Sequence, residues 1–241
     1  MSKVELIPIF EDNYVFLIIN TKQTEAILVD PGESTEAIKA IELKNLKLKA
    51  ILTTHHHADH IGGLSALSEY FGAPVWAPFK NKEQIHAQHY VSSGDEFPID
   101  TFKIQVLELP GHTLGHIAYW FKEQNWLFSG DVLFGLGCGR LFEGSFQQGF
   151  DSLQKIKSLP PETRIFCTHE YTENNLRFAK SLGISENEEL INYEKELTKK
   201  RSLALPSVPL SLSVEKKVNP FLLAKNVAEF TELRKLRNSW V

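Results

Sequence analysis

The sequence predicts an α/β domain followed by a helical C-terminal domain. Up to about residue 171, short apolar segments rich in β-branched and aromatic residues alternate with segments of helical periodicity. Beyond that residue the pattern is helical, apart from one extended, proline-containing stretch over residues 205–219. We therefore expect one domain of residues 1–171 and a second of residues 172–241.

The predicted strands of the first domain are short. They cover residues 4–10, 14–19, 26–30, 50–53, 103–109, 116–121, 126–129 and 164–168. Apolar residues at helical spacing predict helices over residues 34–43, 62–71 and 149–159. Gly72 ends the second of these helices and Pro160 the third, as expected for residues that terminate helices.

Three helices are predicted in the second domain, over residues 172–182, 185–201 and 226–240. Gly183 ends the first of them. Ser185 and Glu188 form a capping-box pattern that opens the second.

Length and composition agree with one sizeable domain and a smaller appendage. The chain has 241 residues, of which 42% are hydrophobic and 23% are charged, enough for a substantial core. With 26 Lys and Arg against 30 Asp and Glu, the net charge of −4 provides no general attraction for nucleic acid or anionic lipid. We therefore expect neither as a partner.

The sequence gives no signal for export or membrane insertion. The longest apolar run near the start, residues 14–19, is far shorter than the roughly 20 residues of a membrane helix. The first ten residues lack the layout of a signal peptide. Cys138 and Cys167 are too few for a disulfide scaffold, although they leave one bridge open. We expect a cytoplasmic protein.

The most informative segment is residues 53–60, Thr-Thr-His-His-His-Ala-Asp-His. It lies between a predicted strand and a predicted helix, and it contains four of the nine histidines. Imidazole and carboxylate groups bind Zn, Fe or Mn, and a turn after a strand can direct alternate side chains at one point. A His-rich surface turn is the alternative, and we give it little weight because this spacing is rarely accidental.

Three further candidate ligands each follow a predicted strand, where side chains from separate strands can converge. Taken singly, each has an ordinary structural interpretation as a capped turn or a core residue. The full set of candidate ligands is His55, His57, Asp59, His60, His112, Asp131 and His169. Seven ligands exceed what one tetrahedral ion uses, whereas two metals bridged by Asp131 would use them all.

Residues 54–60 resemble the T-H-x-H-x-D-H signature of the metallo-β-lactamase superfamily. By that resemblance the fold is an αββα sandwich with two metals at one edge. The resemblance assigns His55, His57 and His112 to the first metal, and Asp59, His60 and His169 to the second, with Asp131 as the bridge.

The other histidines have lesser expected roles. His56 falls on a variable position of the signature. His116 is expected to be structural or to support the ligands. His86 and His89 lie in a polar stretch, and we expect them at the surface.

Several segments outside the signature resemble the glyoxalase II family, the hydroxyacylglutathione hydrolases. They are residues 137–144 (Gly-Cys-Gly-Arg-Leu-Phe-Glu-Gly), 169–172 (His-Glu-Tyr-Thr), 219–221 (Asn-Pro-Phe) and the basic C-terminal helix. The resemblance covers essentially the whole chain. It implies hydrolysis of S-D-lactoylglutathione and related 2-hydroxyacyl glutathione thioesters to glutathione and D-lactate, the second step of methylglyoxal detoxification.

The substrate-binding residues that the resemblance implies are Arg140, Phe142, Tyr171, Arg234 and Arg237. Glutathione carries two carboxylates, which the bidentate guanidinium of arginine suits well. Arg234 and Arg237 share a face of the last predicted helix, which without the resemblance would be read as solvated. Arg237 stands where relatives often have Lys, and Phe142 where some have Tyr, so the strength of glutathione binding is open.

The resemblance also implies the chemistry. Two divalent metals, zinc first with iron or manganese as alternatives, hold a bridging hydroxide that attacks the thioester carbonyl. Asp131 bridges the metals, and Asp59 also orients the nucleophile. The leaving thiolate has a conjugate acid pKa of about 8.5 and departs without a proton donor. Both cysteines are expected to be structural, and we expect a monomer with a small-molecule substrate.

Other functions remain as alternatives. A β-lactamase of the same superfamily would need no basic C-terminal helix, and a persulfide dioxygenase would use one iron and consume oxygen. A nuclease would want a broad basic surface, which the net charge does not favour. A binding module that has lost its metals is disfavoured because all seven ligand positions are occupied.

Overall fold

The computed structural model describes residues 1–183 and 188–240 and divides into two compact units. The first unit comprises residues 1–108 and 115–124, and the second comprises residues 109–114 and the chain from residue 125 onward. Ser185 of the predicted capping box lies outside the described residues. Among the residues described, no helix is both long and apolar enough to cross a membrane.

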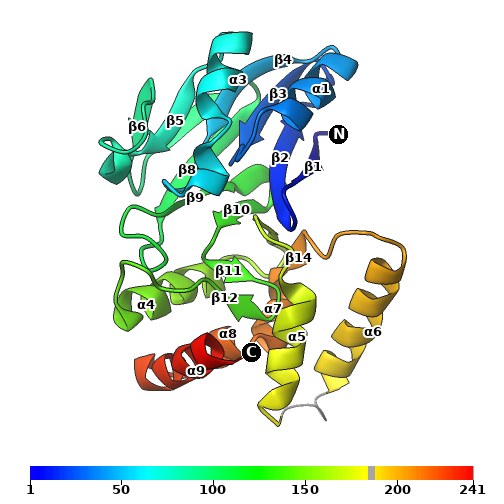
Figure 1. Cartoon of the computed structure of the whole chain (residues 1–241), viewed down its shortest axis with the longest axis vertical. Coiled ribbons are helices and arrows are strands. Elements are labelled where there is room, and N and C mark those ends of the chain that lie inside the picture. Colours follow the sequence, from blue (N-terminus) through cyan, green and yellow to red (C-terminus); the bar gives the residue numbers. More distant parts are fainter. Residues whose placement is uncertain (184–187, 241) are drawn as a thin grey trace. The chain divides into compact units, whose positions relative to one another are not determined.

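The first unit is built on a six-stranded sheet whose strands follow one another in chain order. These strands are β1 (Lys3–Ile9), β2 (Asn13–Ile19), β3 (Glu25–Val29), β4 (Lys47–Leu52), β5 (Val75–Pro78) and β6 (His89–Val91). β1 to β3 pair antiparallel, and β3 to β6 pair in parallel. Helices α1 (Thr35–Leu43) and α3 (Leu64–Phe71) lie along one face of this sheet (Figure 1).

Both faces of this sheet are buried, because all seven residues of β2 are shielded from solvent. Val15, Leu17 and Ile19 join the core that α1 and α3 cover. Their neighbours Phe16 and Ile18 point to the opposite face and are equally buried. A sheet buried on both faces requires a second layer, as a sandwich provides.

A second, antiparallel sheet in the same unit consists of β7 (Glu96–Ile99), β8 (Phe102–Glu108) and β9 (Ile117–Phe121). The Tyr119 hydroxyl of β9 lies 3.0 Å from the carbonyl oxygen of Thr53 and 3.2 Å from that of Trp76. This hydroxyl therefore ties the second sheet to the end of β4 and to β5. Two single-turn 3-10 helices, Phe79–Asn81 and Lys122–Gln124, complete the unit.

The second unit has short strands. They are β10 (Trp126–Gly130), β11 (Leu133–Phe134), β12 (Gly137–Cys138), β13 (Arg164–Cys167) and β14 (Leu210–Ser211). β10 and β13 pair in parallel, β14 pairs antiparallel with β13, and β11 with β12 forms a hairpin. The parallel pair matters most for the site, because both of its strands are followed by candidate ligands.

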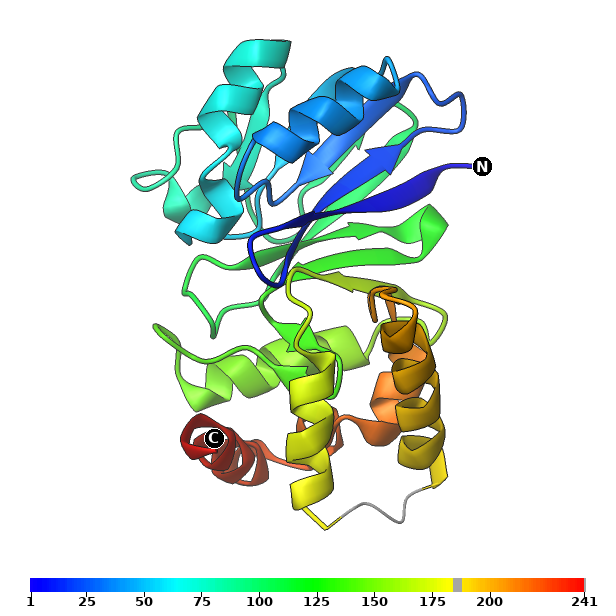
Figure 2. The same ribbon diagram turned by 45° about the vertical axis from the view of Figure 1, so that its right-hand side comes forward.

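Six helices are found among the described residues of the second unit. They are α4 (Phe146–Lys157), α5 (Thr172–Ser181), α6 (Glu188–Ser202), α7 (Leu212–Val218), α8 (Pro220–Leu223) and α9 (Val227–Ser239). α5 and α6 run side by side (Figures 1 and 2), joined by an ion pair between Lys180 and Glu194. α4 packs against α9 through Phe150 and Phe230.

The prediction of an extended stretch over residues 205–219 is wrong in its second half, which forms α7. Leu212, Glu215 and Val218 are buried at a spacing of three residues, so helical periodicity is present. A buried carboxylate in the middle position conceals that periodicity from a hydrophobicity pattern. The first half of the stretch contains β14, in agreement with the prediction.

The other differences concern element ends and short elements. α4 begins three residues earlier than predicted, because Ser145 and Gln148 form a capping box that opens the helix. The sequence prediction missed β5, β6, β7, β11, β12 and the two short helices α2 (Ala58–Ile61) and α8. Each of these has four residues or fewer, too few for periodicity to register.

Candidate functional site

Four of the predicted ligands lie after β4 in the first unit. His55 and His57 precede the short helix α2, and Asp59 and His60 lie within it. A ligand atom of His55 lies within 4.8 Å of one on His57 and of one on His60, and Asp59 and His60 are equally close. His55 and His60 are fully buried, and the other two are half-buried. The turn therefore gathers four metal-binding groups in one place.

Asp30, which directly follows β3, anchors this turn. Its carboxylate accepts hydrogen bonds from the backbone N–H and the hydroxyl of Thr54, at 2.7 and 2.8 Å. The same carboxylate lies 3.2 Å from Nδ1 of His60. A carboxylate at this nitrogen fixes the orientation of the ring and leaves Nε2 available as a ligand. The sequence prediction missed Asp30 as a residue that supports this turn.

Two glycines let the turn after β4, which contains the four candidate ligands, pack closely against the turn after β3. A Cβ atom at Gly32 would lie 2.0 Å from the carbonyl oxygen of Asp59. A Cβ atom at Gly62 would lie 2.3 Å from the carbonyl oxygen of Gly32. Neither contact is sterically possible, so both positions require glycine. This packing fixes the position of α2 and therefore of its two ligands.

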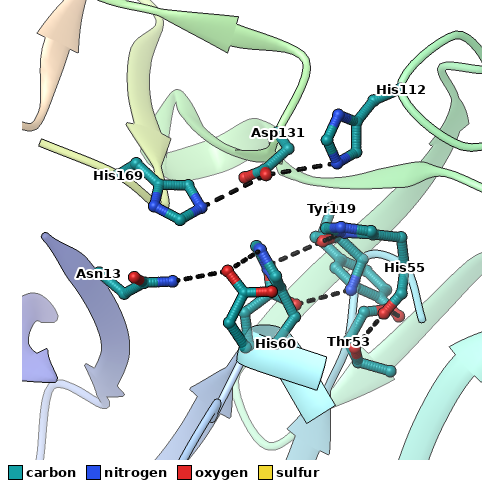
Figure 3. A network of polar contacts seen from close by, with 11 residues as sticks. Asn13, Thr53, His55, His60, His112, Tyr119, Asp131 and His169 are labelled. Atoms are coloured by element: carbon teal, nitrogen blue, oxygen red, sulfur yellow. Dashed lines mark hydrogen bonds and ion pairs between the residues drawn. The ribbon is translucent and has the colours of Figure 1, made fainter. Parts of the chain in front are cut away.

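The donor set of this turn suits a divalent cation. The ring centroids of His55 and His57 are 4.6 Å apart, and those of His55 and His60 are 4.1 Å apart. Imidazole nitrogens this close to one another and to the Asp59 carboxylate form a donor set that divalent metals bind. Asn13 donates a hydrogen bond of 3.0 Å to Asp59 (Figure 3), which stabilises the ionised carboxylate.

The remaining histidines of the first unit support this turn or lie at the surface. His116 is buried and stacks on His55, with ring centroids 4.7 Å apart. Nδ1 of His56 lies 3.0 Å from the Asn81 side-chain nitrogen. His86 and His89 are both exposed.

The other three predicted ligands meet in the second unit. Asp131 and His169 follow β10 and β13, and because these strands pair in parallel, both side chains leave the same end of the sheet. Oδ2 of Asp131 lies 3.3 Å from Nε2 of His169 and 3.4 Å from Nε2 of His112 (Figure 3). All three side chains are buried.

A backbone contact sets the proton position on His112. Its Nδ1 lies 2.8 Å from the carbonyl oxygen of Arg140. A carbonyl only accepts, so Nδ1 donates, and Nε2 of the neutral ring carries the lone pair that faces Asp131. A lone pair and a carboxylate oxygen 3.4 Å apart suit a cation between them. The donor set of the second unit therefore also fits a divalent metal.

Gly139 gives the ligand-bearing segments of the second unit room to meet. A Cβ atom at this position would lie 1.9 Å from the carbonyl oxygen of Asp131 and 3.3 Å from Nδ1 of His112. The first contact is impossible for any residue with a side chain. The glycine after β12 is therefore required for the position of Asp131.

Three arginines predicted to bind substrate gather in the second unit. Arg234 is buried and donates a hydrogen bond of 2.7 Å to the carbonyl oxygen of Cys138. Arg237 is half-buried, and its pKa is lowered first by burial and then by the charges of Arg234 and Arg140. An anionic ligand would offset this mutual repulsion.

The two predicted aromatic contacts lie against candidate ligands. The Tyr171 ring stacks parallel to that of His169, with centroids 4.7 Å apart. Phe142 is 61% exposed and packs edge-on against His112 at 5.2 Å. The Arg140 guanidinium lies 5.9 Å from the Phe142 ring centre. The predicted substrate residues Arg140, Phe142 and Tyr171 are thus neighbours of the candidate ligands of this unit.

Neither cysteine is placed as a nucleophile. Cys138 and Cys167 are both free and buried, so they form no bridge with each other. Burial is the largest cause that raises the pKa of each thiol. Both therefore remain protonated and unreactive near neutral pH.

Two family models match the chain, and together they cover nearly all of it. The model of the metallo-β-lactamase superfamily matches residues 9–169, and that of the hydroxyacylglutathione hydrolase C-terminus matches residues 170–240. A Bdellovibrio bacteriovorus protein named hydroxyacylglutathione hydrolase is 54% identical, over 98% of this chain and 97% of its own length.

Two solved structures are similar in fold. The BLEG-1 B3 metallo-β-lactamase has a TM-score of 0.72 at 26% identity, with 92% of this chain and 100% of its own covered. ETHE1 from Myxococcus xanthus has a TM-score of 0.74 at 26% identity, with 99% of this chain and 91% of its own covered.

Proposed function

Because this chain belongs to the hydroxyacylglutathione hydrolases of the metallo-β-lactamase superfamily, we propose that it hydrolyses S-D-lactoylglutathione to glutathione and D-lactate. The predicted family is confirmed by these matches, and so is the predicted αββα sandwich with a helical C-terminal region. The chain is a metal-dependent hydrolase. Related 2-hydroxyacyl glutathione thioesters are further substrates.

The loop that contains Arg140 links a candidate metal ligand to the predicted substrate-binding arginines. The Arg140 carbonyl accepts a hydrogen bond from His112, while its guanidinium belongs to the cluster with Arg234 and Arg237. Arg140 therefore has two roles. Its backbone carbonyl orients a metal ligand, and its side chain is a cation suited to a glutathione carboxylate. This arrangement suits an anionic thioester whose reacting carbonyl must reach a metal centre.

We assign the seven ligands to two divalent metals in the pattern of the superfamily. His55, His57 and His112 would hold the first metal, Asp59, His60 and His169 the second, and Asp131 would bridge them. These donors accept zinc, iron or manganese, and zinc is the first choice. Two such ions would supply a Lewis acid for the thioester carbonyl and a hydroxide at neutral pH.

The protein's own groups orient these ligands. Asp30 orients His60, the Arg140 carbonyl orients His112, and Asn13 donates to Asp59. Each contact helps to hold its ligand side chain in position. The leaving thiolate, with a conjugate acid pKa of about 8.5, departs without a proton donor.

The two parts of the chain have separate roles in this proposal. Residues 1–171 form the catalytic domain, and residues 172–241 supply most of the substrate-binding cations. The enzyme acts as a cytoplasmic monomer on a small molecule, without nucleic acid or membrane partners. The charge of −4 supports the absence of nucleic acid and membrane partners.

A comparison of substrates tests the proposal. S-D-lactoylglutathione and a simple thioester without the glutathione carboxylates would be assayed by loss of thioester absorbance. We expect kcat/KM to favour the glutathione thioester by on the order of 100-fold, since each charge-assisted contact is worth about tenfold. Equal turnover of the two substrates would contradict a site built for glutathione.

Two related activities serve as controls for the reaction class. A chromogenic cephalosporin tests for β-lactamase activity, and an oxygen electrode with a glutathione persulfide tests for a dioxygenase. Neither alternative is favoured, because the chain matches the hydroxyacylglutathione hydrolase C-terminus over residues 170–240. Turnover of either compound in preference to the thioester would replace the proposed reaction.

A further inference from the structure

We propose that Trp240, Phe178 and Asn175 are positioning residues for glutathione, which hold the Arg237 guanidinium in one orientation. The proposal rests on the proposed function and deepens it. It assigns a role to residues of α5 and of the end of α9, outside the residues that the family resemblance implies.

Aromatic rings surround the Arg237 guanidinium. Its central carbon lies 5.2 Å from the Trp240 ring centre and 5.5 Å from that of Phe178. The two rings also contact each other edge to face, with centroids 5.8 Å apart. A cation attracted to the faces of two rings that brace each other has little freedom to rotate.

Asn175 provides the polar restraint. Nη2 of Arg237 lies 3.3 Å from Oδ1 of Asn175, and the Asn175 amide nitrogen donates to the carbonyl oxygen of Gly135 at 3.0 Å. The second bond fixes which end of the amide faces the arginine. Asn175 is itself buried, and a Cβ atom at Gly137 would lie 2.3 Å from it, so the amide is tightly confined.

Positive charge is in excess around Arg237. Burial and then the charges of Arg234 and Arg140 lower the pKa of Arg237, and no carboxylate of the described residues is among the groups that raise it. Arg234 is already satisfied by the Cys138 carbonyl and the Asn238 side chain. Arg237 is therefore the cation of this pair whose charge is available for a ligand carboxylate.

The same contacts explain the choice of arginine. A guanidinium is planar, stacks on aromatic rings and keeps further N–H groups for a carboxylate while it donates to Asn175. An ammonium is a more strongly hydrated point charge and lacks the planar face. Trp240 and Arg237 thus form one recognition unit, and Arg237→Lys should weaken it although the charge is retained.

Trp240 is the residue to change, because it is half-exposed at the end of α9, whereas Phe178 is fully buried. We expect Trp240→Leu to raise KM for S-D-lactoylglutathione about three- to fivefold with kcat unchanged, the loss of one cation–π contact. Trp240→Phe should restore most of the loss, since it returns a ring face. In an Arg237→Ala background, Trp240→Leu should have no further effect on KM.

A matched control is Leu236→Ala on the same helix, whose side chain is 49% exposed and outside these contacts. Thermal unfolding of each variant separates loss of fold from loss of substrate binding. If Trp240→Leu leaves KM unchanged, or acts equally with and without Arg237, the positioning role is wrong. If the wild-type enzyme itself does not hydrolyse the glutathione thioester, the proposed function fails and this inference falls with it.

Discussion

Nδ1 of His112 lies 2.8 Å from the backbone carbonyl oxygen of Arg140, so the neutral ring presents the lone pair of Nε2 to Asp131. A single hydrogen bond thereby determines the protonation of one candidate metal ligand. It also joins that ligand to a loop whose arginine side chain belongs to the cluster suited to glutathione. The link between metal binding and substrate recognition is thus made by backbone atoms.

Asp131 is the first residue to test. Its carboxylate lies within 3.4 Å of both His112 and His169, so Asp131→Ala removes the group on which both rings converge. We expect metal content and thioester turnover to fall together, measured by elemental analysis and absorbance on the same samples. Asp151→Ala, on the exposed side of α4, is the control. Retention of either metal or turnover would contradict the bridging assignment.

Asp30→Asn should weaken metal binding without unfolding the chain. Asp30 has a φ of 51°, a conformation that Asn tolerates, but the amide loses the negative charge next to His60. We expect metal affinity to fall about 10- to 100-fold, measured by competition with a chelator. Asp100→Asn is a matched control, because Asp100 has a φ of 52° and accepts a bond from Asn20. If Asp30→Asn and Asp100→Asn bind metal with equal affinity, Asp30 does not support the metal ligands.

Glu215 should make the free energy of unfolding depend on pH. Burial raises the pKa of this carboxyl from 4.5 to about 7, while Leu136, Tyr193 and Asn219 donate to it and oppose the rise. Between these values the folded chain keeps the proton that the unfolded chain has lost. The contribution of Glu215 to the free energy of unfolding is therefore fully present below pH 4.5 and is lost as the pH rises to 7. The total loss is up to about 3 kcal/mol.

The measurement is chemical denaturation of the wild type and Glu215→Gln from pH 5 to 8. The difference in unfolding free energy between the two should shrink as the pH rises, because glutamine does not titrate. Glu232→Gln, at an exposed position of α9, should follow the wild-type curve. Parallel curves for wild type and Glu215→Gln would show that this carboxyl does not titrate in that range.

Gly139→Ala should disrupt the site through sterics alone. The added Cβ atom would lie 1.9 Å from the Asp131 carbonyl oxygen, so this backbone must move. We expect a lower melting temperature and a lower metal content. Gly72→Ala is the contrast, since its φ of 64° carries a strain of about 1 kcal/mol but no atom lies within 4 Å. Normal metal binding by Gly139→Ala would mean that the segment tolerates displacement.

The candidate ligands were predictable because each follows an apolar strand, and a strand end defines where a side chain points. Asp131 and His169 illustrate this, since the parallel pairing of β10 and β13 brings them together. Asp30 also follows a strand, but its Val-Asp-Pro-Gly context is typical of an ordinary turn. Its role depends on the contact with His60, thirty positions later, which no local pattern encodes.

Helix α7 and the contacts of Arg237 show a second limit of prediction from the sequence. Glu215 occupies a buried position of α7 because Tyr193 and Asn219 satisfy it, so a charged residue stands where periodicity expects an apolar one. Trp240 and Asn175 are 65 residues apart in the sequence and meet only through the guanidinium of Arg237. Contacts between residues this far apart in the sequence, which satisfy a buried charge or hold a side chain, can be identified only in the folded chain.

Metal-dependent turnover of S-D-lactoylglutathione tests the central claim most directly. The loss of thioester absorbance would be followed with enzyme as purified, after removal of metal by a chelator, and after reloading with zinc, iron or manganese. We predict turnover before removal, its loss in the stripped enzyme and its return with at least one of the three metals. Turnover that persists in fully stripped enzyme, or none in enzyme shown to hold two metals, would contradict the account.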